Sequence, residues 1–236
     1  MKRMGNEEMG HYHTVLFDVD GTLLDFKAAE KSGIDVVMQQ YGVCPTEELR
    51  RQYRAINDRL WREYEEGSID RQYIMDTRFA EFFQNLGKTV NGAEAEKLYR
   101  KQLDRSAVLI DNAIEICACL SAGHALYVVT NGVSQTQHRR IKDSGLAPYF
   151  KGIFVSEDAG SQKPQKEFFE YCFSRMPDED RTHMLIVGDA LASDIKGGNN
   201  AGIDTCWYNP GQIKPDVDVR IDYEITDLLE LKGIVG

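Results

Sequence analysis

Short, mainly apolar runs alternate with longer amphipathic segments along most of this chain. An apolar run bounded by turn residues is typical of a strand that is buried on both faces, as in a parallel sheet. Because segments of about ten residues with helical periodicity lie between the later runs, the pattern predicts an α/β fold with a doubly wound parallel sheet. The predicted strands are residues 14–17, 125–129, 152–155, 184–187, 205–207 and 222–225, the helices between them are residues 112–120, 135–144, 166–176 and 193–202, and residues 156–164 are predicted as a loop.

The segment between the first two predicted strands has a different pattern. Leu49, Tyr53, Ile56, Leu60 and Tyr64 recur at spacings of three and four residues, which is the period of an amphipathic helix. Three more segments of this kind occur at residues 26–41, 70–86 and 93–103. The pattern predicts an all-helical domain of residues 25–105, inserted into an α/β core that comprises residues 1–24 and 106–236.

Polar residues cluster where the predicted strands end. Asp18 and Asp20 follow the first strand, Thr130 and Asn131 the second, Lys163 the third, and Asp189 the fourth. In a parallel sheet these ends lie along one edge, where open α/β sheets bind their ligands. Two carboxylates as close as Asp18 and Asp20 cannot both stay ionised without a cation or a shared proton. The pattern therefore predicts a divalent metal ion at this edge.

This combination of side chains suits phosphoryl transfer. A carboxylate can attack phosphorus to form an aspartyl-phosphate, and a second carboxylate two residues away can protonate the leaving oxygen and later deprotonate water. Mg²⁺ accepts carboxylate oxygens while it keeps a substrate phosphate oxygen. Lys163, the Thr130 hydroxyl and nearby backbone N–H groups can bind the remaining phosphate oxygens.

Four motifs in this chain resemble, in order and type, those of the haloacid-dehalogenase superfamily of phosphatases. They are residues 18–22 (DVDGT), 130–132 (TNG), 163–164 (KP) and 188–194 (GDALASD). The resemblance extends over about residues 12–231. It implies a Rossmann-like catalytic core of subfamily IA, with the helical insertion as a C1-type cap.

The resemblance also implies roles for individual residues. Asp18 would be the nucleophile, and Asp20 the general acid and base that also lends its backbone carbonyl to Mg²⁺. Asp189 would be a further metal ligand, so the implied metal set is Asp18, Asp20 and Asp189. The remaining implied roles are phosphate binding by Thr130, Asn131, Gly132 and Lys163, with Lys163 also counted as catalytic, and ordering of Lys163 or a metal-bound water by Asp194.

Two further segments, residues 53–69 and 197–207, resemble the YjjG/YfnB branch of this superfamily. The resemblance implies a 5'-nucleotidase that prefers pyrimidine deoxynucleotides such as dUMP and dTMP. Asn57 and Trp61, four residues apart on a predicted cap helix, either pack beside its apolar stripe or contact the base or sugar.

Three alternative functions follow from the same residues. The superfamily core also occurs in sugar-phosphate phosphatases and phosphomutases, and the cap decides between these and a nucleotidase. A phospho-ligand sensor is a non-enzymatic alternative, which the retention of every motif residue disfavours. Dehalogenase activity is disfavoured because a carbon–halide substrate needs neither the metal nor the second acid.

Charge and composition narrow the expected partners. The 236 residues carry 38 acids and 28 bases, a net charge of −10, which disfavours a nucleic acid polymer as a partner. The apolar runs are far shorter than the ~18 residues that span a bilayer. Residues 1–8 have no apolar signal-peptide core. We therefore expect a cytoplasmic protein without a membrane partner, a monomer or weak homodimer, that acts on a small phosphomonoester.

Three smaller predictions concern packing. The five cysteines are scattered and have no metal-ligand spacing, so they are predicted to be buried, reduced thiols. The charged residues at positions 65–66 and 178–181 are predicted to be solvated. Gly197 and Gly198 are predicted to allow close packing rather than to bind phosphate.

Overall fold

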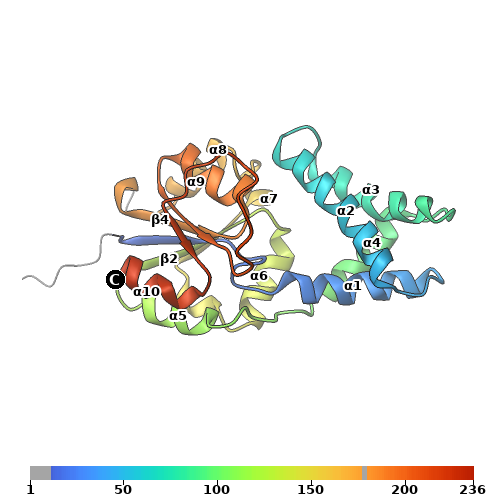
Figure 1. Ribbon diagram of the computed structural model, residues 1–236, viewed down its shortest axis with the longest axis horizontal. Helices are drawn as coiled ribbons and strands as arrows, with labels where there is room; N and C mark the ends of the chain where they lie inside the picture. Colours follow the sequence, from blue (N-terminus) through green and yellow to red (C-terminus); the bar gives the residue numbers. More distant parts are fainter. Residues whose placement is uncertain (1–11, 177–179) are drawn as a thin grey trace, which may run out of the picture.

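The computed structural model describes residues 12–176 and 180–236. Two of the expectations above, the lack of a signal-peptide core at residues 1–8 and the solvated charges at residues 178 and 179, concern positions outside the described residues. In the part that is described, a six-stranded α/β core carries a block of four helices beside it (Figure 1).

The core sheet contains six parallel strands. In sheet order they are β3 (Gly152–Val155), β2 (Ala125–Thr130), β1 (Thr14–Phe17), β4 (Met184–Gly188), β5 (Asp204–Tyr208) and β6 (Tyr223–Ile225). The chain adds β2 and β3 on one side of β1, and β4, β5 and β6 on the other, so the strand order reverses between β1 and β4. This arrangement confirms the predicted doubly wound fold, and such sheets bind ligands at the reversal point, beyond the carboxyl ends of the strands.

Strand β1 illustrates why the apolar runs become buried strands. Val15 and Phe17 belong to the hydrophobic cluster on one face of the sheet, and Leu16 belongs to the cluster on the other face. This follows from the alternation of side chains along a strand. All three residues are completely buried, so helices must cover both faces.

Helices do cover both faces (Figure 1). On the face with Leu16, α8 (Lys166–Phe173) packs through Phe168 and Phe169. On the opposite face, α5 (Ala113–Leu120) and α10 (Leu231–Val235) pack against Val15 and its neighbours. The remaining elements of the core are α6 (Ser134–Asp143), α7 (Ser156–Ala159), α9 (Lys196–Ala201), the 3-10 turns η1 (Ala147–Tyr149), η2 (Arg181–His183) and η4 (Leu228–Glu230), and a π-helical turn, η3 (Leu191–Ile195).

The four helices between β1 and β2 have a hydrophobic core of their own. They are α1 (Phe26–Gln40), α2 (Glu47–Glu65), α3 (Arg71–Asn85) and α4 (Gly92–Leu103). The rings of Tyr53, Phe79 and Tyr99 pack against one another in tilted and edge-to-face arrangements, at ring-centroid distances of 4.8 to 6.2 Å. Burying a large apolar side chain contributes about 1.5–3 kcal/mol, so this cluster stabilises the block apart from the sheet.

The two chain segments that join the helical block to the core lie side by side. The N–H of Asp25 donates to the carbonyl of Val108 at 2.8 Å, and the N–H of Ile110 donates to the carbonyl of Leu23 at 3.0 Å. Leu24 and Leu109 form an antiparallel bridge between them. The entry and exit of the block are therefore tied together at one place.

Part of the predicted loop at residues 156–164 is helical, so that prediction was wrong for α7. Glu157 and Asp158 lie in its first turn, where negative side chains favour a helix. Gly160, with φ of 69°, ends the turn in the left-handed conformation that favours glycine.

The packing predictions for the cysteines and glycines are partly confirmed. All five cysteines are free, and Cys117, Cys172 and Cys206 are buried. Cys44 is exposed in the loop between α1 and α2, and Cys119 is exposed because it does not belong to the buried face of α5. A Cβ at Gly197 would lie 2.7 Å from Phe169, and one at Gly198 would lie 2.6 Å from Ile186, which confirms close packing. Among the described residues, no helix has the length and apolar character needed to cross a bilayer.

Candidate active site

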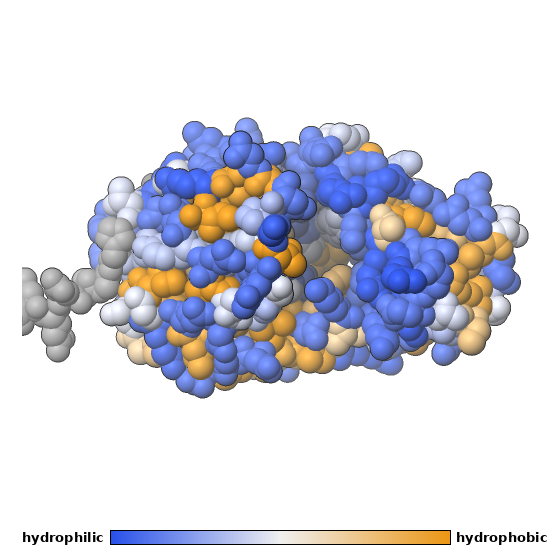
Figure 2. All heavy atoms as spheres, viewed as in Figure 1, coloured by the Kyte–Doolittle hydropathy of each residue, from blue (hydrophilic) through white to orange (hydrophobic). Residues whose placement is uncertain are grey.

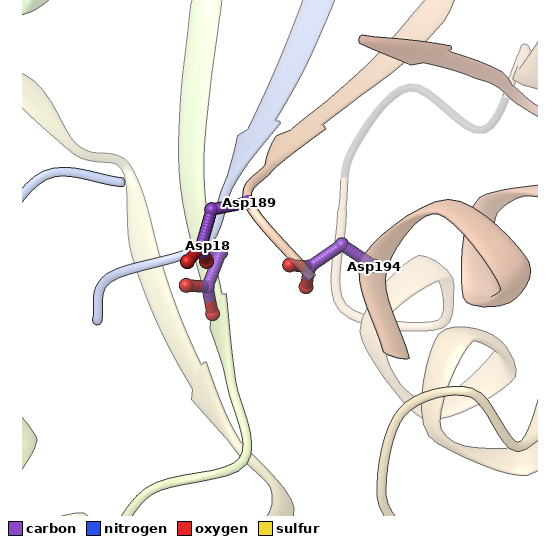
Figure 3. A group of neighbouring side chains, drawn as sticks. All are labelled: Asp18, Asp189 and Asp194. Carbon is purple, nitrogen blue, oxygen red and sulfur yellow. The ribbon is translucent and has the colours of Figure 1, made fainter. Parts of the chain in front are cut away.

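Three carboxyl groups meet where the strand order reverses. Asp18 follows β1, Asp189 follows β4, and Asp194 lies in η3. One oxygen of each lies within 4.8 Å of the others. Figure 3 shows the carboxyl groups of Asp18 and Asp189 close together and that of Asp194 directed toward them from the following helical turn. The sheet register brings this about, because Phe17 pairs with Val187 and so aligns the ends of β1 and β4.

Two glycines leave room for these carboxyl groups. Gly21 has a φ of 92°, and a Cβ at this position would lie 2.3 Å from Oδ2 of Asp189. A Cβ at Gly188 would lie 2.3 Å from Cγ of Asp194. Both distances are far below van der Waals contact, so a larger residue at either position would displace an acid.

Lys163 lies at the centre of the acidic group. Its ammonium donates to Oδ1 of Asp18 and to Oδ1 of Asp194, both at 2.6 Å, and to the carbonyl of Val129 at 2.9 Å. The residue is 1% exposed. Asn131 fixes its backbone, since the Asn131 amide donates to the carbonyl of Lys163 at 2.9 Å and accepts from its N–H at 2.8 Å.

The charges of this group are strongly perturbed. Burial raises the pKa of Asp18 well above its ordinary value, against the effect of Lys163 and together with that of Asp194. Burial, and then Asp194, raise the pKa of Asp189 to about 7. Burial lowers the pKa of Lys163, but Asp18 and Asp194 outweigh burial, so the net shift is upward. Lys163 alone does not supply enough positive charge to keep the pKa values of Asp18 and Asp189 at their ordinary level, whereas the neighbouring acids are sufficient to keep the pKa of Lys163 above its own.

A divalent cation with oxygen ligands fits this arrangement. Three carboxylates and one ammonium leave two negative charges when all are ionised. Both oxygens of Asp194 already accept hydrogen bonds, one from Lys163 and one from the N–H of Ala190. Asp18 and Asp189 are therefore the carboxylates best able to bind a metal, and hard oxygen donors are what Mg²⁺ prefers.

Thr130 has its hydroxyl oriented by its neighbours. Its oxygen accepts from the N–H of Gly132 and from Nε2 of Gln137, both at 3.2 Å. A threonine hydroxyl has two acceptor positions and one proton, so the proton is the part that remains for a ligand. Gly132 also makes room for Gln137, since a Cβ there would lie 2.2 Å from Nε2 of Gln137.

Asp20 is held by two residues of α6. Nη1 of Arg140 pairs with Oδ1 of Asp20 at 2.5 Å, and Nε2 of Gln137 donates to Oδ2. The side chain of Asp20 is 27% exposed, whereas that of Arg140 is 1% exposed. The two α6 residues thus lie behind the carboxyl group of Asp20, which itself reaches a cavity.

The cavity has a volume of about 350 Å³ and is lined by both the core and the helical block. Figure 2 shows the surface hollowed between these two parts. Asp18, Thr130 and Lys163 line it from the core, and Asn57 and Trp61 line it from α2. The sequence left open whether Asn57 and Trp61 pack within the helical block or contact a ligand. Both have packing partners, since Asn57 accepts from Arg78 at 2.8 Å and Trp61 packs edge-on against Tyr64, and both also line the cavity.

Glu65, at the end of α2, also lines the cavity. The prediction of a solvated charge was wrong for Glu65, although Glu66 is exposed. α2 points its last turn at the site, so burial, and then Asp194, raise the pKa of Glu65 to about 7. No local pattern in α2 indicates this position, because it depends on how the helical block packs on the core.

A buried ionic network forms the end of the cavity within the helical block. Arg78 donates from Nε and Nη2 to Glu96 at 2.8 and 2.7 Å, and Arg100 donates to Glu96 at 2.8 Å. The guanidinium of Arg78 lies 4.6 Å from the ring centre of Tyr99. Arg78 and Glu96 are 3% and 4% exposed, so this is a fully enclosed pair.

Sequence reasoning missed Gln137 and Arg140 as well. A signal was available, since Thr136, Gln137, Arg140 and Ile141 form the buried face of α6, where three of four residues are polar. Polar residues at buried helical positions need partners, which points to a site. The side chains of Arg78 and Glu96 carried the same signal on α3 and α4, at positions 18 residues apart.

Comparison with known proteins agrees with this geometry. A family model described as haloacid dehalogenase-like hydrolase matches residues 12–202. The chain is 46% identical to the HAD-hydrolase YfnB of Bacillus subtilis over 97% of both chains. A magnesium-bound crystal structure of YfnB, which reveals interdomain movement, has a TM-score of 0.90 over 95% of this chain and 99% of that chain. The pyrimidine 5'-nucleotidase PynA of Streptococcus pneumoniae is 34% identical over 93% of both chains, and YjjG of Escherichia coli, also a pyrimidine 5'-nucleotidase, is 28% identical over 94% of this chain and 96% of its own.

Proposed function

The chain belongs to the haloacid dehalogenase-like hydrolase family, and on that premise we propose that it is a Mg²⁺-dependent 5'-nucleotidase for pyrimidine deoxynucleotides such as dUMP and dTMP. It is a phosphoric monoester hydrolase. The observation that carries the proposal is the buried cluster of Asp18, Asp189 and Lys163, which lines a cavity shared with the helical block. Its unbalanced negative charge calls for a cation, and a phosphate dianion beside that cation has the proton of the Thr130 hydroxyl as a donor and the positive charge of Lys163 close by.

Asp18 is the proposed nucleophile. One of its carboxylate oxygens forms a bond to phosphorus while the bond from phosphorus to the ester oxygen breaks, and the electron pair of that bond stays on the ester oxygen. Asp20 gives its proton to this oxygen, so the nucleoside leaves as an alcohol. In the second step the Asp20 carboxylate takes a proton from water as the water oxygen attacks phosphorus, and Asp18 is released as a carboxylate together with inorganic phosphate.

The other core residues hold the phosphate and the nucleophile in place. Lys163 donates to Asp18 and keeps one of its oxygens in a fixed position. The proton of the Thr130 hydroxyl remains for a phosphate oxygen, while the Asn131 side chain acts on the backbone of Lys163. Mg²⁺, when bound by Asp18, Asp189 and the main-chain carbonyl of Asp20, supplies positive charge that offsets the negative charge of both the acids and the phosphate.

The preference for pyrimidine nucleotides rests on two kinds of support. PynA and YjjG, which are similar over nearly their whole length, are pyrimidine 5'-nucleotidases. The cavity of about 350 Å³ is within the range of about 300–1,000 Å³ that holds small ligands. Trp61 offers an aromatic face and Asn57 an amide at the end of the cavity away from the sheet, so these residues are the proposed contacts of base or sugar.

The helical block, residues 25–105, is proposed to act as a lid over this site. Arg71 of α3 pairs with Glu157 of α7 at 2.5 Å and donates to the carbonyl of Gly132 at 3.3 Å. Gln162 donates to the carbonyl of Tyr64 at 2.6 Å. These few polar contacts, with the paired linkers at Asp25 and Val108, would allow the block to open for the substrate and close over it.

A substrate panel tests the proposal. The purified protein is incubated with dUMP, dTMP, dAMP, glucose 6-phosphate and glycerol phosphate, and released phosphate is measured with Mg²⁺ and with EDTA. We expect kcat/KM for dUMP and dTMP to exceed that for the sugar phosphates by at least about tenfold, and EDTA to abolish activity that added Mg²⁺ restores.

Other outcomes of the panel would contradict the proposal in distinct ways. Faster hydrolysis of the sugar phosphates would make this a sugar-phosphate phosphatase. Binding of phosphate esters without their hydrolysis would indicate a phospho-ligand sensor. Full activity in EDTA would remove the metal from the mechanism and leave the excess charge of Asp18 and Asp189 without an explanation.

A further inference from the structure

We propose that Gln137 and Arg140 are positioning residues that hold the carboxyl group of Asp20 in the orientation needed for proton transfer. The inference rests on the proposed function, because it assigns Asp20 the transfer of a proton to the leaving oxygen. Neither α6 residue belongs to the four motifs that identify the family in this sequence. Their role would be specific to this step and would not extend to phosphate binding by Lys163.

The geometry is that of a two-sided clamp. Arg140 pairs with Oδ1 of Asp20 and Gln137 with Oδ2, so each carboxyl oxygen has its own donor. The two donors lie three residues apart on one face of α6, and are themselves 1% and 2% exposed. With both oxygens held, rotation of the carboxyl group about its bond to Cβ is prevented, and the remaining lone pair of each oxygen is left for the cavity.

The clamp is itself held by the surrounding structure. Nε of Arg140 donates to the carbonyl of Ser106 at 3.0 Å, and its guanidinium carbon lies 5.9 Å from the ring centre of Phe26. Ser106 and Phe26 belong to the two segments where the chain leaves and enters the helical block. Gln137 donates to Thr130 as well as to Asp20. The clamp therefore connects Asp20 to the linkers on one side and to the end of β2 on the other.

The burial of Arg140 is hard to explain by stability alone. A buried guanidinium is costly unless its donors are satisfied, and Nη2 of Arg140 has no hydrogen-bond partner within the described residues. Its acidic partner, Asp20, remains partly exposed toward the cavity. Nη1 of Arg140 thus donates to Asp20, which is the acid that transfers a proton in the proposed mechanism.

The leaving group of the substrate separates this role from others. Nitrophenolate is stable enough to leave without a proton, whereas the 5'-oxygen of dUMP is a poor leaving group and needs one. The ratio kcat/KM covers the steps up to departure of the leaving group. A fault in the orientation of Asp20 must therefore lower kcat/KM for dUMP much more than for p-nitrophenyl phosphate, whereas damage to folding or phosphate binding lowers both together.

The experiment compares Arg140→Met and Gln137→Met with matched controls on the exposed side of the same helix, Arg139→Met and Gln135→Met. For each variant, kcat/KM is measured with dUMP and with p-nitrophenyl phosphate at saturating Mg²⁺, and inhibition by inorganic phosphate reports binding. We expect both clamp variants to lose about 10- to 100-fold more with dUMP than with p-nitrophenyl phosphate, which is part of the 10²- to 10⁴-fold that general acid catalysis supplies. The control variants should match wild type, and inhibition by phosphate should change less than about twofold in Arg140→Met. Gln137→Met also loses the hydrogen bond to Thr130, so for this variant the ratio between the two substrates is the measure and not the inhibition by phosphate.

Two comparisons complete the test. Asp20→Asn sets the largest possible difference between the losses in kcat/KM with dUMP and with p-nitrophenyl phosphate. Arg140→Lys, which keeps a cation beside Asp20, should recover part of the kcat/KM for dUMP that Arg140→Met loses. Equal losses with both substrates in the soluble clamp variants, or no loss in either, would overturn the proposal. If Arg140→Met does not fold, Gln137→Met alone decides it. Failure of the proposed function would be evident earlier, since the wild-type protein would then not hydrolyse dUMP.

Discussion

The core and the helical block each enclose a cluster of buried charges, and the two clusters differ in their balance. In the core, Asp18 and Asp194 share one lysine, and Asp189 lies beside them with no cationic partner of its own among residues 12–176 and 180–236. In the helical block, Arg78 faces Glu96 through two hydrogen bonds, and Arg100 adds a second guanidinium at the surface of the pair. The core cluster therefore has an excess of negative charge, whereas Arg78 and Glu96 of the helical block neutralise each other.

This difference distinguishes a site from a structural element. A buried charge is tolerated when its partner is close and well oriented, as for Arg78 and Glu96. Burial raises the pKa values of Asp18 and Asp189, and Lys163 offsets this effect only in part. A ligand must complete that cluster, so changes there should affect activity more than folding, while changes to the Arg78 pair should affect folding more than the chemical step.

The largest effect is expected from Asp18→Asn. The amide cannot form the phosphoenzyme, so kcat/KM should fall by at least about 10³-fold with every phosphate ester. Because the substitution removes an uncompensated buried charge, the Tm of the metal-free protein should stay the same or rise. Phosphate release and thermal unfolding of the same preparation measure both.

A matched control for this variant lies in the helical block. Asp70 caps α3 by accepting from the N–H of Tyr73 at 2.7 Å, and asparagine caps a helix equally well. Asp70→Asn should therefore leave both activity and Tm unchanged. Substantial activity in Asp18→Asn would remove this residue as nucleophile, and a marked fall in its metal-free Tm would mean that the core cluster is as structural as that of the helical block.

The next effect in size is the loss of the balanced pair in Arg78→Met. The variant leaves Glu96 buried with only Arg100, and breaking a buried pair costs about 3–5 kcal/mol, here at the lower end because Arg100 remains. The free energy of unfolding in urea, followed by circular dichroism and by the fluorescence of Trp61 in α2 and Trp207 in β5, measures the loss.

The double variant Arg78→Met with Glu96→Gln sharpens this result. Without a lone carboxylate, the protein should regain part of the stability that the single variant loses, and the coupling between the two substitutions should be about 1–3 kcal/mol. An Arg78→Met protein that is as stable as wild type would mean that the network exists for a ligand in the cavity and not for the fold.

The sequence predicted the core in detail because its signals are local. Apolar runs marked the strands, and each run led directly into the polar residues that the sheet register later brings together, as for Asp18 after β1 and Asp189 after β4. The family resemblance of the four motifs is confirmed as well. The core motifs did not predict the contacts of Gln137 and Arg140 with Asp20, because these residues lie 117 and 120 positions away from Asp20 in the sequence.

The helical block was predicted as four helices and, from the family resemblance, as a cap whose Asn57 and Trp61 either pack or contact the substrate, but its other cavity residues were not predicted. Its apolar periodicity gave the helices, whereas the cavity residues depend on how the block is placed over the sheet. The prediction of a solvated charge fails at Glu65 because nothing in the sequence of α2 shows that its last turn points at Asp194. Helix periodicity indicates which face of a helix is buried, but it does not indicate which part of the protein covers that face. A site between two parts of a chain can be predicted only when the covering part is known.

The smallest effect concerns Glu30, an acid of α1 that tests whether the charges of the helical block are fully balanced. Glu30 is 5% exposed, and its nearest cation is Arg54, 4.0 Å away. Burial, and then Asp58, raise the pKa of Glu30 to about 7 from an ordinary value of 4.5. Since the folded protein holds this proton more tightly than the unfolded chain, Glu30 favours the folded state most below pH 4.5, and this contribution is lost as the pH rises toward 7.

Glu30→Gln replaces the carboxyl group with a neutral amide and should remove this dependence. The free energy of unfolding of the variant minus that of wild type should increase by about 1–3 kcal/mol from pH 5 to pH 8, because wild type loses this stability as Glu30 gives up its proton. Urea denaturation at each pH measures the difference. Asp58→Asn, which removes the acid that adds to the shift, should reduce the slope of the wild-type curve part of the way. If the difference between Glu30→Gln and wild type is the same at pH 5 and pH 8, Arg54 and Arg78 compensate Glu30 completely. The helical block would then contain no charge without a partner, and the contrast with the core would be stronger than the structure indicates.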